Sequence, residues 1–154
     1  MYGFNRTARR GFVMAVLFSA AIILSGCATS YNHSFDPAMG YGGLKSYNWV
    51  SSTGYSSDLV VKNVQYLADQ ALEAKGFKKA AENPDMLVSV QYENEIGINE
   101  YGYRLRMLTI GIQKADGKQS IWRGTATGSI STDAGSGDLK NAVQGILAKF
   151  PPTK

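Results

Sequence analysis

Two segments of the chain carry apolar residues at intervals of three and four, which predicts two amphipathic helices. The first begins at Asp58 and ends at Gly76, because glycine adopts the left-handed conformation of a helix end at little cost. Ser57 is expected to cap its first turn by accepting backbone N–H groups. The second helix is expected from Leu139 to Phe150.

Other segments alternate apolar and polar residues with the period of two that is typical of β-strands. Short strands with aromatic faces are expected over residues 31–35 and 44–50, and a well-buried strand over residues 86–92. The clearest hairpin joins residues 103–114 to residues 120–130 through an Asp-Gly pair, which suits a type I′ turn. The alternation of its first strand slips after Met107, so a bulge is expected between Met107 and Leu108.

The predicted order is strand, strand, helix, three strands, helix. Because there are too few crossover helices for a parallel sheet, we expect an α+β fold, with a mainly antiparallel β-sheet and two amphipathic helices packed on one face. A chain of 154 residues with 44% hydrophobic and 18% charged residues is expected to form a single globular domain. Its one cysteine excludes an internal disulfide.

The amino-terminal segment has the layout of a secretory signal. Three arginines and no acidic residue precede the apolar run Gly11–Leu24, which is shorter than the roughly 20 residues that span a bilayer. The run ends in Leu24-Ser25-Gly26-Cys27, which resembles the lipobox of bacterial lipoproteins. We therefore expect cleavage between Gly26 and Cys27 and acylation of the Cys27 thiol. Arg9-Arg10 leaves open whether export uses the general or the twin-arginine route.

Three parts of the chain follow from this signal: a cleaved signal peptide over residues 1–26, a lipidated terminus and short tether over residues 27–30, and one globular domain over residues 31–154. In lipoproteins an Asp after the modified cysteine retains the protein in the inner membrane, so Ala28 indicates the outer membrane, with the domain facing the periplasm.

Removing residues 1–26 leaves 13 basic against 12 acidic residues. This balance gives no reason to expect nucleic acid as a partner. The membrane is expected to be a partner through the acyl chains on Cys27.

Several motifs together resemble the family of bacterial envelope lipoproteins catalogued as domain of unknown function 4136. The resemblance covers nearly the whole chain after the signal. It implies an envelope location and a fold but no activity, so no catalytic residue is carried over. The motifs that carry it are Cys27, Tyr31–Asp36, Leu44–Trp49, Ala71–Phe77, Asn83–Val88, Ile121–Ala126 and Ala142–Pro152.

Candidate chemistry is sparse in this sequence. Glu93 and Glu95 lie two apart on a probable strand and point the same way, with a spacing like that of the carboxylates of inverting glycoside hydrolases. If the strand turns back near residue 100, residues whose numbers sum to 199 pair, which places Arg106 opposite Glu93 and Arg104 opposite Glu95. Salt bridges are the simpler interpretation. His33, the one histidine, is expected to lie beside aromatic rings, with a general base as the alternative.

No metal site and no cofactor are expected, because the sequence lacks a second histidine, a cysteine pair and a phosphate-binding glycine motif. Exposed aromatic residues are the best indication of a partner surface, with core packing as the alternative. The candidates for this surface are Tyr41, Tyr47, Trp49, Tyr55, Tyr101 and Tyr103.

The favoured hypothesis is a non-catalytic, outer-membrane-anchored lipoprotein whose domain binds another envelope component, either a protein or the cell-wall polymer. The first alternative is a periplasmic glycan hydrolase that uses Glu93 and Glu95, which would have to share a cleft with no arginine opposite. The second is a carrier of a small apolar ligand between helices and sheet, which requires more cavity than a core of this size usually leaves.

Overall fold

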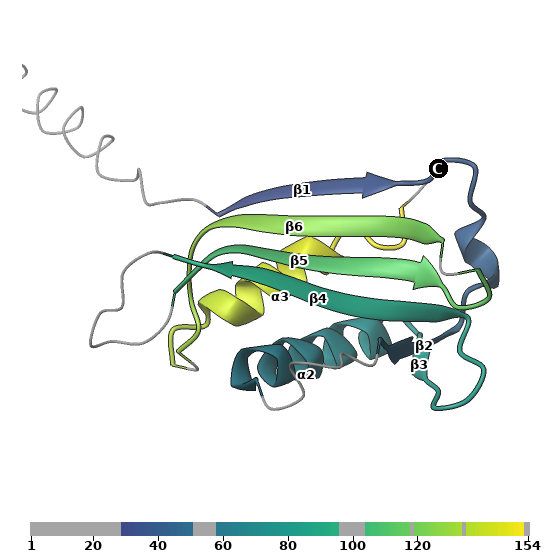
Figure 1. Cartoon of the computed structure of the whole chain (residues 1–154), viewed down its shortest axis with the longest axis horizontal. Coiled ribbons are helices and arrows are strands. Elements are labelled where there is room, and N and C mark those ends of the chain that lie inside the picture. The colour runs from purple at the N-terminus through teal and green to yellow at the C-terminus, as the bar shows by residue number, and fades with distance from the viewer. Residues whose placement is uncertain (1–28, 51–57, 96–103, 118, 134, 153–154) are drawn as a thin grey trace, which may run out of the picture.

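The computed structural model describes residues 29–50, 58–95, 104–117, 119–133 and 135–152. Within these ranges, six strands form one sheet in the order β1-β6-β5-β4-β2-β3. Both long helices lie on one face of that sheet (Figure 1). The elements are β1 (Ser30–Phe35), a 3-10 turn η1 (Tyr41–Gly43), β2 (Ser46–Trp49), α2 (Leu59–Ala74), β3 (Lys78–Lys79), β4 (Met86–Asn94), β5 (Arg104–Lys114), β6 (Ser120–Ser131) and α3 (Asp138–Leu147).

The predicted α+β architecture is confirmed, since β1, β6, β5 and β4 are joined in antiparallel pairs beneath two helices. Two features of the sheet were not predicted. The strand β2 pairs in parallel with both β3 and β4, and the two-residue strand β3 consists of Lys78 and Lys79. Two lysines show no alternation of apolar and polar residues, so periodicity gives no signal for this strand.

The start of α2 differs from the prediction. The N-cap is Asp58 rather than Ser57, because an Asp58 carboxylate oxygen accepts the backbone N–H groups of Val60 at 2.9 Å and Val61 at 3.4 Å. Ser57 lies outside the described residues. The predicted end is confirmed: Gly76 has a φ of 89°, and its N–H donates to the carbonyl oxygen of Glu73 at 2.9 Å.

A β-bulge is present in β5, as predicted, but it lies at a different residue from the one expected. From Met86 to Glu93 the paired residue numbers sum to 200, and Glu93 faces Met107. The next pair joins Asn94 to Leu105 and passes over Arg106, so the extra residue is Arg106 and not a residue between Met107 and Leu108. The expected sum of 199 therefore holds only beyond the bulge, where the N–H of Glu95 donates to the carbonyl of Arg104 at 2.8 Å.

One hydrophobic core lies between the helices and the sheet. Its aromatic centre is Phe150, whose ring lies 5.4 Å from Phe77, 5.3 Å from Trp122 and 6.1 Å from Tyr41. Phe77 directly follows the glycine that ends α2, and Phe150 lies just beyond α3, which ends at Leu147 and not at the predicted Phe150. In the described part of the chain, neither helix is both long and apolar enough to span a bilayer.

Candidate functional site

Tyr47 belongs to the core and not to an exposed surface, which corrects its assignment to a partner-binding patch. Its side chain is 0% exposed, and its hydroxyl donates a hydrogen bond to Asp69 Oδ1 at 2.8 Å. Burial, followed by the Asp69 carboxylate, raises the pKa of Tyr47 above its usual value. Tyr47 of β2, a candidate for the exposed surface, is therefore buried in the core and hydrogen-bonded to Asp69 of α2.

Trp49 is half-buried and is held by the same carboxylate, since its indole Nε1–H donates to Asp69 Oδ1 at 2.9 Å. The second oxygen of Asp69 accepts Lys79 Nζ at 2.9 Å. One residue of α2 thus fixes two strands that lie beside it. Sequence reasoning missed Asp69, although it directly follows the buried Ala68 and so lies next to the apolar stripe of the helix.

Tyr41 is half-buried as well, and its hydroxyl donates to the carbonyl oxygen of Ile121 at 2.6 Å. Burial raises the pKa of this phenol, although a hydrogen bond with the Asp36 backbone lowers it in part. The other predicted surface aromatics, Tyr55, Tyr101 and Tyr103, lie outside the described residues. Of the predicted residues that the structure describes, Tyr41, Tyr47 and Trp49 do not form one exposed patch.

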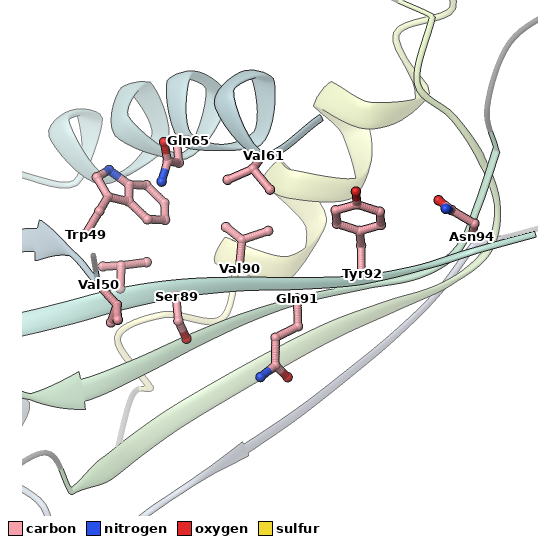
Figure 2. Close-up of a pocket in the computed structure, with 10 residues that line it drawn as sticks. Trp49, Val50, Val61, Gln65, Ser89, Val90, Gln91, Tyr92 and Asn94 are labelled. Carbon is pink, nitrogen blue, oxygen red and sulfur yellow. The ribbon is translucent and has the colours of Figure 1, made fainter. Parts of the chain in front are cut away.

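A hollow of about 550 Å³ lies between α2 and β4, beyond the end of β2. Figure 2 shows Val90 and Tyr92 pointing from β4 toward the helix, whereas Ser89 and Gln91 point to the other side of the sheet. The indole of Trp49 lies at one end of this space. We call it the α2–β4 groove, and its lining residues are Trp49, Val50, Val61, Gln65, Val88, Ser89, Val90, Gln91, Tyr92 and Asn94.

The α2–β4 groove combines apolar walls with neutral amides. None of its described lining residues carries a formal charge. A second hollow of about 450 Å³ adjoins it at the start of α2 and shares Tyr92 and Asn94 with it. The Tyr92 hydroxyl donates a hydrogen bond to the Asp58 carboxylate, and both residues line the second hollow. The α2–β4 groove itself suits an uncharged ligand segment, because a charge on the ligand would find no oppositely charged side chain among its described lining residues.

Glu93 and Glu95 form the salt bridges that the sequence suggested. Arg106 contacts the Glu93 carboxylate, and Arg104 Nε lies 3.7 Å from Glu95 Oε2. Ser129 Oγ also donates to Glu95 at 2.7 Å. The glutamate side chains are 46% and 44% exposed, and neither lines either of the two hollows. The condition for a hydrolase, two carboxylates in one cleft without an opposing arginine, is not met.

His33 lies on the exposed edge strand β1, with its ring stacked on Phe35 at a centroid distance of 6.2 Å. This agrees with the expected position beside aromatic rings. Within the described ranges, no three His, Cys, Asp or Glu side chains are placed to hold a metal ion. The predicted cleavage and acylation residues Gly26 and Cys27 lie outside those ranges.

Comparison with known proteins gives a family and a fold. The family model described as Domain of unknown function (DUF4136) matches residues 29–152. No curated protein matches the chain.

Two solved structures share the fold at low sequence identity. A PDZ domain protein from Parabacteroides distasonis ATCC 8503 is 14% identical with a TM-score of 0.61, and the match covers 88% of this chain and 39% of that one. This chain thus spans about two fifths of that protein's length. PelC from Paraburkholderia phytofirmans, solved as a dodecamer, is also 14% identical, with a TM-score of 0.54 over 82% of this chain and 100% of that one.

Proposed function

The chain belongs to the family described as Domain of unknown function (DUF4136), and from that membership we propose that it is a non-catalytic lipoprotein of the bacterial envelope. Acyl chains on Cys27 hold it at the outer membrane, the domain faces the periplasm, and its role is to bind another envelope component. The basic front, the apolar run and the Leu24–Cys27 motif support the anchor.

The α2–β4 groove is the observation that carries the binding role. It offers about 550 Å³ beside a half-buried tryptophan, with no charged residue among its described lining. Such a surface fits a neutral, extended segment of a protein or a glycan strand, because apolar contact provides affinity and the amides of Gln65 and Asn94 provide hydrogen bonds. The pairing of Glu93 and Glu95 with arginines supports a role without catalysis.

The anchor is tested by membrane fractionation and intact mass of the wild type and Cys27→Ser. We expect wild type in outer-membrane fractions, with a mass that corresponds to cleavage before Cys27 plus acyl chains, and a soluble or uncleaved variant. Ala28→Asp is the matched control, since it retains the thiol and is expected to move the acylated protein to the inner membrane. An unmodified Cys27 in the wild type would contradict the proposal.

The binding role is tested with a photoreactive amino acid at Gln65, which lines the groove, and at Gln70, an exposed position on the same helix. Irradiation of cells is expected to give adducts at position 65 and few at position 70. Protease digestion of the adduct identifies a protein partner, and muramidase digestion identifies the cell-wall polymer. Equal yields at the two positions would count against the groove.

The same hollow favours a second candidate, a carrier of a small apolar ligand. Organic extraction of the purified protein followed by mass spectrometry tests this function. A stoichiometric lipid that is lost in Val61→Trp, where the larger side chain fills the groove, would favour the carrier over the binding protein.

A further inference from the structure

The start of β1 is fixed to the domain very close to the predicted anchor. Ser30 pairs with Thr127 of β6, and a side chain added at Gly128 would lie 3.2 Å from the Cα of Thr29. Cys27 precedes Thr29 by two residues. Since a chain extends at most about 3.6 Å per residue, the Cα of Cys27 lies within about 7 Å of Thr29.

Several other elements begin or end at the same end of the domain as β1 (Figure 1). Pairing places the end of β6 beside the start of β5, where Ser131 faces Arg104. The N–H of Ser131 also donates to Asp138 in the first turn of α3 at 3.4 Å. The Tyr92–Asp58 hydrogen bond brings the start of α2 to the last part of β4. We call this the anchor end, and its residues include Ser30, Leu59, Arg104, Ser131, Asp133 and Asp138.

We propose that the anchor end is a lipid-contacting surface, which rests on the proposed acylation of Cys27. With a tether this short, the acyl chains hold this end against the phospholipid headgroups. Leu59, in the first turn of α2, is 69% exposed, more than any other large apolar side chain of the described residues. It provides the apolar contact with the bilayer surface.

The charges at the anchor end determine the kind of contact. Among the described residues of this end, Asp58, Glu95, Asp133 and Asp138 are acidic and Lys62, Arg104 and Lys140 are basic, so these residues carry no excess of positive charge. Attraction to anionic headgroups therefore does not hold it to the membrane, and screening by salt leaves the contact unchanged.

The opposite end of the domain faces away from the bilayer. β5 has 11 residues, which at a rise of about 3.3 Å per residue spans roughly 35 Å. Asp116 lies at this far end, in the turn that directly follows the last residue of β5. The proposal thus predicts that the anchor end lies much closer to the bilayer than the opposite end does.

The experiment uses the full acylated protein in vesicles of phosphatidylethanolamine and phosphatidylglycerol that contain a spin-labelled lipid quencher. Acylation occupies the native thiol, so Asp133→Cys and Asp116→Cys each provide one site for a fluorophore. We expect quenching at least threefold stronger at position 133 than at position 116, and equal at 50 and 500 mM NaCl. Adding Leu59→Gln to Asp133→Cys is expected to lower the quenching at position 133.

Equal quenching at the two sites, stronger quenching at position 116, or loss of the difference in high salt would overturn the proposed orientation. No effect of Leu59→Gln would remove Leu59 from the contact. Intact mass distinguishes failure of the proposed orientation from failure of the proposed acylation. An acylated protein with equal quenching at positions 133 and 116 refutes the orientation alone. An unacylated protein refutes the lipoprotein proposal.

Discussion

The Asp58 carboxylate joins α2 to β4, because one oxygen caps the helix and the other accepts the Tyr92 hydroxyl. Both hollows depend on the position of α2 over β4, and Tyr92 lines both of them. A single side chain therefore helps to set the width of the proposed binding surface.

Asp58→Ala is expected to lower the free energy of unfolding by about 2 kcal/mol, since it removes the helix cap and the acceptor of Tyr92. Tyr92→Phe is expected to cost about 1 kcal/mol. Urea denaturation of both variants and the double variant gives the coupling between them, which we expect to exceed about 0.5 kcal/mol. Strict additivity would show that the hydrogen bond does not stabilise the fold.

Asp69→Ala removes the acceptor of the buried Tyr47 hydroxyl and of the Trp49 indole N–H. We expect a loss of about 2 to 4 kcal/mol in urea denaturation, because two donors lose their partner in or near the core. Lys79→Ala, which removes only the exposed partner of the same carboxylate, is the control and is expected to cost less than about 1 kcal/mol. Similar losses in both variants would contradict the role assigned to Asp69.

Asp85 makes stability dependent on pH. The Lys45 N–H at 2.9 Å, and then the side chain and N–H of Ser46 at 2.8 Å, lower the pKa of this carboxyl in the folded state. Its stabilising effect is thus fully present above the unfolded pKa and is lost as pH falls through the folded pKa. Thermal denaturation is expected to show Asp85→Asn less stable than wild type at pH 6, with a smaller difference at pH 3. A difference that grows in acid would reverse the assigned sign.

Gly145 lies beneath the ring of Tyr31, and a Cβ added at this position would overlap that ring. Alanine is favoured over glycine inside a helix by about 1 kcal/mol. In a Tyr31→Ala background, Gly145→Ala is therefore expected to raise the free energy of unfolding by that amount. With Tyr31 present the gain is expected to vanish, because β1 must shift. Calorimetry of the four proteins tests this pair, and an equal gain in both backgrounds would contradict the contact.

The sequence predicted those features that depend on nearby residues. The stripe of α2, the hairpin of β5 and β6 and the turn at Gly76 follow from residues close together in the sequence, and each is present. The predicted type I′ turn at Asp116-Gly117 is wrong, because neither residue has the positive φ that this turn requires. The arginines opposite Glu93 and Glu95 were predicted from pairing alone, and only the bulge at Arg106 altered their register.

Features that depend on distant contacts were not predicted. The parallel pairing of β2 with β4 joins residues about 40 positions apart, and the bonds of Asp69 to two strand residues join positions about 20 apart. The aromatic residues show the same limit, because an aromatic side chain on a short strand fits either a core or a surface. Burial of Tyr47 is decided by a helix that covers it, and no pattern within residues 44–50 contains that information.

The position of β1 has a mechanical consequence. If the domain is anchored at Cys27 and bound to a partner, any pull between them enters through the start of β1. This strand is antiparallel to β6 and pairs with it from Ser30 to Phe35. Force along the strand axis loads these pairs together in shear, whereas force across it would separate them one after another. The connection between anchor and domain thus resists stretching best when β1 stands perpendicular to the membrane.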